Sequence, residues 1–128
     1  METLITNGIK VSVETFFQNG HSNPAEDRFI HAYRITIENL GLDSVQLLRR
    51  HWIIFDSSGE IREVEGEGVI GQQPILEPSG AHQYVSLCNL QTTIGKMHGS
   101  YEMLNLSTGK TFDVDIPKFD LIAPFVLN

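Results

Sequence analysis

Three glycines in the middle of the chain have a spacing that, in other folds, binds phosphate. Gly66, Gly68 and Gly71 follow the pattern G-x-G-x-x-G within the stretch VEGEGVIGQQP. In dinucleotide-binding folds this pattern lies between a strand and a helix, where backbone N–H groups and the helix N-terminus bind a pyrophosphate. The pattern therefore raises the hypothesis of a small-anion or nucleotide site.

The residues around these glycines favour a different role. Pro74 and Pro78 restrict the residues before them to extended conformations, so no helix is expected to begin at Gly71. Four glutamates near the loop would repel an anion, with only Arg62 to oppose them: Glu60, Glu63, Glu65 and Glu67. We interpret the glycines as serving the backbone, because glycine tolerates positive φ and lets two chain segments approach closely. Anion binding by exposed N–H groups of the loop is the alternative.

Histidine, cysteine and serine side chains lack the spacing of a metal or catalytic site. The histidines lie in separate segments with no H-x-H or H-E-x-x-H pattern: His21, His31, His51, His82 and His98. His82 and Cys88 would share one strand face, but about 20 Å apart by strand rise, which is too far for one ion. Ser86 does not stand in a G-x-S-x-G nucleophile elbow. We expect no metal site, no cofactor and no enzymatic activity.

Length, charge and hydropathy limit the class of protein further. The 128 residues are expected to form one domain, residues 1–128, with 16 acidic and 9 basic side chains and a net charge of −7. This charge would repel nucleic acid. The single cysteine excludes an internal disulfide, and the short apolar runs exclude a spanning helix. Without a signal-peptide pattern at the N-terminus, we expect a cytoplasmic protein.

The positions of these residues depend on strands, because apolar residues mostly recur with period two. Polar and apolar residues alternate in Ile9–Val13, Phe29–Glu38, Glu60–Glu65 and Thr111–Ile116. Turn residues separate these segments at short intervals, and no long helical pattern interrupts them. The spacing predicts an all-β fold of about seven to eight strands, a sandwich in preference to a barrel.

Three further features have a structural and a functional interpretation. In the apolar segment VQLLRRHWIIF we expect Trp52 in the core and Arg50 paired with an acidic neighbour. The segment Phe119 to Phe125 either packs along an edge or leaves apolar surface for a protein partner. The number of copies in the assembly, monomer or homodimer, stays open.

Several stretches in the same order resemble the ApaG family of small bacterial proteins. VEGEGVIGQQPILEPSG and HQYVSLCNLQTTIGKMHGSYEM are similar to its central region, and RITIENLGLDSVQLLRRHWIIFDSSG and FDVDIPKFDLIAP to the flanking motifs. The resemblance runs from about Ile5 to Asn128. The chain departs from the family pattern at Pro78-Ser79-Gly80 and Ser86-Leu87-Cys88, which touches no catalytic group known for the family.

The resemblance implies a fold similar to immunoglobulin and fibronectin type III sandwiches. It also implies a protein-recognition module, because related domains occur in eukaryotic proteins that bind other proteins. Bacterial members are associated with cobalt resistance and magnesium efflux. We therefore predict a non-enzymatic domain that binds another protein and affects divalent cations indirectly. The alternative is an anion-binding protein that uses Gly66, Gly68 and Gly71.

Overall fold

Most of the described residues lie in strands. The computed structural model describes the backbone of residues 1–127 and the side chains of residues 1–125. Within that part, helix is limited to two 3-10 turns, Pro24–Glu26 and Pro124–Leu127, and no helix is long enough to cross a membrane. The described strands are β1 (Glu2–Thr6), β2 (Ile9–Phe17), β3 (Phe29–Asn39), β4 (Val45–Asp56), β5 (Ile61–Glu67), β6 (Ile75–Leu76), β7 (Ala81–Leu90), β8 (Ile94–Asn105) and β9 (Thr111–Ile122).

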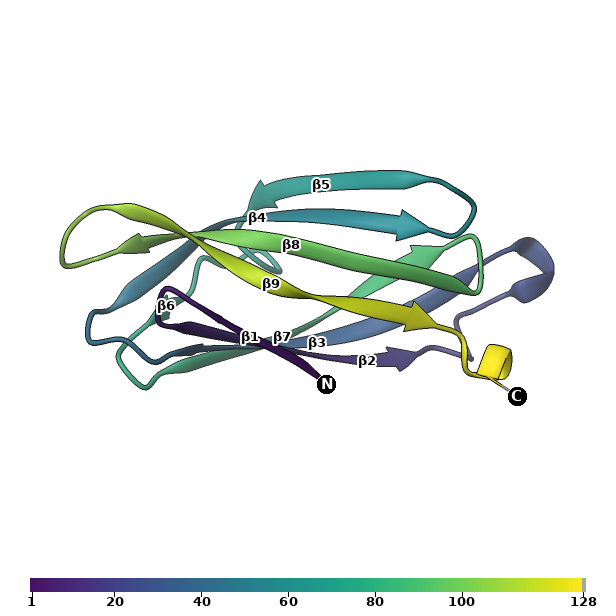
Figure 1. The fold of residues 1–128 in the computed structure, drawn as a ribbon, viewed down its shortest axis with the longest axis horizontal. Helices are drawn as coiled ribbons and strands as arrows, with labels where there is room; N and C mark the ends of the chain where they lie inside the picture. Colours follow the sequence, from purple (N-terminus) through teal and green to yellow (C-terminus); the bar gives the residue numbers. More distant parts are fainter. Residues whose placement is uncertain (128) are drawn as a thin grey trace.

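The strands form two antiparallel sheets that pack as a sandwich (Figure 1). One sheet has the order β1-β2-β3-β7, and the other has the order β5-β4-β8-β9 with β6 paired to the end of β4. The sandwich is closed along one side, where β1 lies against β9 and Asn7 Nδ2 donates to the carbonyl of Asp113 (2.9 Å). At the opposite side the free edges belong to β5 and β7. The predicted all-β sandwich is confirmed, with the short β1 and β6 raising the strand number above the expectation.

The core follows from the alternation of side chains across each strand. Apolar residues of both inner faces are almost completely buried, as in Ile35, Leu47 and Val114. Trp52 is 3% exposed and meets the ring of Phe119 edge to face at 5.9 Å between centroids. The prediction that Trp52 lies in the core is confirmed.

The C-terminal segment differs from the strand predicted over Thr111–Ile116. Strand β9 continues to Ile122, and the register against β8 shifts between the pairs of Met97 and Gly99, near Pro117. Proline is tolerated here because β9 is an edge strand. Phe119 and Leu121 are buried, so these two side chains pack along the edge and leave no apolar surface for a partner. Phe125 is 45% exposed.

Candidate functional site

The glycine loop is a tight backbone turn at the end of β5. Gly68 and Gly71 have φ of +63° and +71°, in the left-handed region that favours glycine. The N–H of Gly68 donates to the carbonyl of Leu48 (2.8 Å), and Val69 and Gln72 exchange hydrogen bonds through their own N–H and C=O groups. The N–H groups of these three residues are thus already satisfied, which leaves few donors for a phosphate.

The three glycines of the pattern differ in how much space a side chain would have. A Cβ on Gly68 would lie 2.2 Å from the carbonyl oxygen of Gln72, which is a clash with backbone. A Cβ on Gly66 would lie 2.8 Å from Nη1 of Arg50, whose guanidinium rests against the β5 backbone. A Cβ on Gly71 would meet nothing within 4 Å. The loop contains no helix start after Gly71, as the prolines predicted.

Arg50 is a candidate functional residue whose surroundings the sequence did not predict. The expected acidic partner is wrong: Nη1 of Arg50 donates to the backbone carbonyls of Glu67 and Gly68, each at 3.0 Å. No carboxylate among the described side chains lies within ion-pair distance of this guanidinium. Alternation within RRHW could have predicted that Arg50 shares the inner face with Trp52.

Arg50 lies in a cleft between the free edges of β5 and β7. The cleft consists of two adjoining hollows of about 270 and 230 Å³. Both hollows are lined by Tyr33, Arg50, Trp52 and Ser86. The glycine loop closes one end through Ile70 and Gly71, and at the other end Arg62 bridges to the carbonyl of Asn89.

Tyrosines beside the cleft stay neutral and do not compensate the charge of Arg50. The hydroxyls of Tyr84 and Tyr101 lie 2.5 Å apart in a buried hydrogen bond. Burial raises the pKa of Tyr84 and of Tyr101, and it also raises the pKa of Tyr33. The cleft therefore offers neutral hydroxyls and two guanidinium groups, of which Arg62 is already bound to the carbonyl of Asn89 and Arg50 lies between the two hollows. This combination suits a carboxylate or another anion.

Strand β7 forms the free edge of the four-stranded sheet. Its sequence, AHQYVSLCNL, contains no Asp, Glu, Lys, Arg or Pro. Its register with β3 runs unbroken from Glu38↔Ala81 to Phe29↔Leu90. The strand is therefore long, regular and uncharged, unlike the free edges that proteins usually protect.

The backbone of β7 directs alternate peptide groups to the open side. Ile30 on β3 points its own backbone away from β7, because its N–H donates to Ser22 Oγ (3.0 Å) and its carbonyl accepts from Gln18 (2.8 Å). Ile30 is opposite Asn89, so Asn89 faces outward, as its bond from Arg62 shows. Antiparallel ladders alternate hydrogen-bonded and outward-facing positions. The N–H and C=O groups that face the open edge therefore also include those of Gln83, Val85 and Leu87.

A second cluster lies on the outer face of the β4–β5 hairpin. Nε2 of His51 is 2.7 Å from Oε1 of Glu63 and 3.5 Å from Oε1 of Glu65. The three side chains could offer ligand atoms within 4.8 Å of one another, but all are exposed or half-buried. The hydrogen bond between His51 and Glu63 is sufficient to explain the cluster. The sequence analysis missed this cluster because it compared the histidines only with one another. If the two strands are paired across the Ser57–Gly59 turn, His51 comes to lie beside Glu63 and Glu65.

The remaining candidate residues are placed apart from one another. His31 and Cys88 are opposite each other on β3 and β7, and both are buried. Burial lowers the pKa of His31 to about 4 and raises the pKa of the Cys88 thiol, which disfavours the thiolate. Nε2 of His31 has no hydrogen-bond partner among the described residues. Within the same residues no hydrogen bond joins His82 to Ser86.

Comparison with known proteins identifies the family of this chain. Residues 19–105 match the family model described as the ApaG domain. The chain belongs to the ApaG family. Protein ApaG of Brucella anthropi is 48% identical over 124 residues, which cover 97% of this chain and 95% of that protein. Protein ApaG of Paramagnetospirillum magneticum is 44% identical with the same coverage.

A solved structure supports the ApaG fold of the chain directly. The crystal structure of the putative ApaA protein from Bordetella pertussis aligns with a TM-score of 0.87 at 39% identity. The alignment covers 91% of this chain and 94% of that structure. The ApaG resemblance and the β-sandwich predicted from the sequence are both confirmed.

Proposed function

We propose that this ApaG domain is a non-enzymatic protein-recognition module of the cytoplasm that binds its partner at the open side of the sandwich, along β7. The observation that carries the proposal is the outward-facing row of peptide groups at Gln83, Val85 and Leu87. An extended segment of another protein can pair with such an edge and become the next strand of the sheet. The side chains of Val85 and Leu87 are 53% and 61% exposed, which adds apolar surface beside the peptide groups.

The other free edges give less support to strand addition. Strand β1 has only five residues, and β9 is interrupted by Pro117 and by its register shift. Strand β5 carries acidic side chains at Glu63, Glu65 and Glu67. Short strands, proline and charge are the devices that block edge pairing. Only β7 lacks all of these devices among the described edge strands.

A capture experiment with two matched variants tests the proposal. Leu87→Lys places a charge on the β7 edge, and Ile5→Lys places the same charge on the β1 edge at a residue of similar exposure, 57%. We expect a protein captured from a lysate of the source cells by the unmodified domain and by Ile5→Lys, and lost with Leu87→Lys. Equal capture by both variants would contradict binding at β7.

We attribute the family association with cobalt resistance and magnesium efflux to the protein partner and not to cation binding by the domain itself. We expect the domain to affect divalent cations by binding a protein that handles them, because its own His51 cluster is explained by a hydrogen bond to Glu63. A strain carrying Leu87→Lys should then show the same change in cobalt tolerance as a strain without the protein. Normal tolerance in that strain would separate the cation effect from β7.

Binding of pyrophosphate or a nucleotide at Gly66, Gly68 and Gly71 is the second candidate function. Its favourable observation is the guanidinium of Arg50 beside Gly66, and its unfavourable one is the occupied N–H groups of the loop. Titration with pyrophosphate and nucleotides, with and without Mg²⁺, should move the backbone amide signals of residues 64 to 74 if this candidate holds. Unchanged signals at millimolar ligand would remove it.

A further inference from the structure

We infer that the segment added to β7 carries an aspartate or glutamate flanked by apolar residues, and that its carboxylate binds Arg50 in the cleft. The inference rests on the proposed function and specifies the chemistry of its partner. It follows from three features: the two sides of an added strand, the unpaired charge inside the cleft, and the neutral, partly apolar surface outside.

An added strand would present its side chains alternately to the two sides of the sheet. Inner-facing residues of β7, such as Tyr84 and Ser86, line the cleft. A side chain of the added strand on the same side would therefore enter the cleft toward Arg50. Its two neighbours in sequence would lie on the outer face, beside Val85 and Leu87.

On the side of the added strand that faces the cleft, a negatively charged side chain would neutralise Arg50. Both hydrogen bonds of Arg50 to the glycine loop start from Nη1, so Nη2 and Nε are available to a ligand. The nearby hydroxyls of Tyr33 and Tyr84 stay protonated, because burial raises the pKa of each phenol. A guanidinium fork binds a carboxylate with two parallel hydrogen bonds. An acidic side chain is the natural counter-ion for this position.

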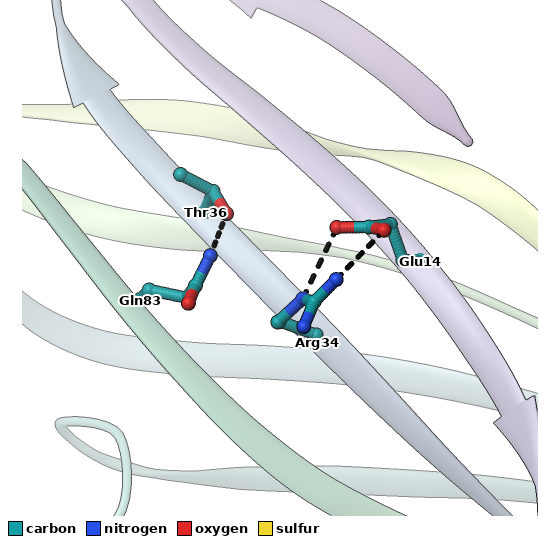
Figure 2. Close-up of polar contacts among 4 residues, drawn as sticks. All are labelled: Glu14, Arg34, Thr36 and Gln83. Atoms are coloured by element: carbon teal, nitrogen blue, oxygen red, sulfur yellow. Dashed lines mark hydrogen bonds and ion pairs between the residues drawn. The ribbon is translucent and has the colours of Figure 1, made fainter.

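The outer side does not require charge. Figure 2 shows that Arg34, on the outer face of β3, is already paired with Glu14. The guanidinium of Arg34 donates to both carboxylate oxygens, from Nε at 3.1 Å and from Nη2 at 2.8 Å, and it covers the ring of Phe16 at 5.2 Å. The remaining exposed surface at Val85 and Leu87 is apolar. Apolar residues on either side of the acidic one therefore fit this face.

A second copy of the chain fits the edge less well. If two β7 strands paired around a two-fold axis, the inner side of the partner strand would present tyrosine, serine and cysteine, because AHQYVSLCNL has no acidic residue. Arg50 would then stay without a counter-ion. Two copies with a net charge of −7 each would also repel one another.

The test compares two peptides that differ at one position. The peptide KVTVEVTVK has a central glutamate between valines, and KVTVQVTVK has glutamine there. Binding is measured by titration calorimetry, and the site by the amide signals of Val85 and Leu87. We expect the glutamate peptide to bind about tenfold more tightly, since a hydrogen bond to a charged group is stronger than a neutral one. Non-specific attraction to an acidic protein would favour the glutamine peptide instead.

Variants of the protein assign the preference to Arg50. Arg50→Met should bring the affinity ratio of the two peptides close to one, and Gly66→Ala should reduce it because the new methyl group displaces the guanidinium. Arg34→Met is the matched control: it removes a paired arginine from the opposite face and should leave the ratio unchanged. The amide spectrum of each variant verifies that it is folded.

The outcomes separate this inference from the proposed function. Equal binding of both peptides at Val85 and Leu87 would overturn the acidic preference and leave recognition at β7 standing. If neither peptide binds, the inference falls; capture of a partner that is lost with Leu87→Lys would still support the module. A β7-paired homodimer in sedimentation would also overturn it.

Discussion

Strands β5 and β7 face the same open side of the sandwich, yet their chemistry is opposite. β5 carries three glutamates on its outer face and a tight glycine loop at its end, whereas β7 is uncharged and unbroken along ten residues. The comparison teaches that this chain protects β5 from pairing and leaves β7 available. Two cations between them have no carboxylate partner among the described side chains: Arg62 belongs to β5, and Arg50 comes from β4.

The largest expected effect concerns the loop that ends β5. Gly68→Ala should destabilise the domain by about 4 kcal/mol, from a positive φ and a backbone clash with Gln72 together. Gly71→Ala, at a similar φ but in open space, should cost only about 1 kcal/mol. Denaturant unfolding of both variants measures the difference. Equal losses would show that the close approach at Gly68 is not what fixes the loop.

The next effect concerns the pH dependence of stability that comes from His31 on β3, the strand paired with β7. His31 is buried opposite Cys88, and its pKa is about 4 in the folded chain against 6.5 in the unfolded one. Below pH 6.5 the unfolded chain binds a proton that the folded chain does not. The free energy of unfolding should therefore fall by about 3 kcal/mol between pH 6.5 and 4.

The variant His31→Leu isolates this contribution from the carboxylates that titrate in the same range. Its unfolding free energy should depend on pH less steeply than that of the unmodified chain over this interval. Parallel pH profiles for the two proteins would show that His31 is not held neutral by burial.

A smaller effect on stability concerns the hydrogen bonds that join the end of β4 to the β7–β8 turn. Asp56, at the end of β4, accepts hydrogen bonds from Thr92 and from the N–H of Gln91 (2.6 Å) in the β7–β8 turn. Burial alone would raise the pKa of Asp56, but these bonds and that from Ser58 outweigh it and lower the pKa.

Asp56→Asn should therefore cost about 2 kcal/mol at neutral pH, because charge-assisted bonds become neutral ones. The difference should shrink as the pH falls through the pKa of Asp56 in the folded state. Asp120→Asn, on the exposed face of β9, provides the control and should change stability little. Thermal unfolding of the three proteins at two pH values measures both effects.

The smallest effect on stability comes from adding a charge to the edge strand β7 or removing one from the edge strand β5. Leu87→Lys should change the unfolding free energy by no more than about 0.5 kcal/mol, because the side chain is exposed. It should not increase association at high concentration, whereas Glu65→Val, which removes a protecting charge from β5, should increase it. Light scattering at matched concentrations measures this. The reverse ranking would contradict the assignment of β7 as the unprotected edge.

Much of the fold could be predicted, because strand periodicity is a local property of the sequence. Alternation located the inner face of β3, and the apolar segment VQLLRRHWIIF placed Trp52 in the core, without any structure. The extension of β9 past Pro117 was missed, because a proline is compatible with a strand only where that strand lies at an edge. The burial of His31 was also missed, because the histidines were compared only with one another, although His31 alternates in phase with the apolar Phe29 and Tyr33.

The sequence by itself determined that VEGEGVIGQQP forms no phosphate-binding helix start: Pro74 and the following Pro78 act through local sterics, and the glutamates act through local charge. Only the tertiary structure decided what the glycines accommodate. The guanidinium that rests on Gly66 and the carbonyl that approaches Gly68 come from residues brought there by strand pairing and by the turn. The same is true of the open edge, because whether a strand has a neighbour depends on sheet order, which local sequence does not encode.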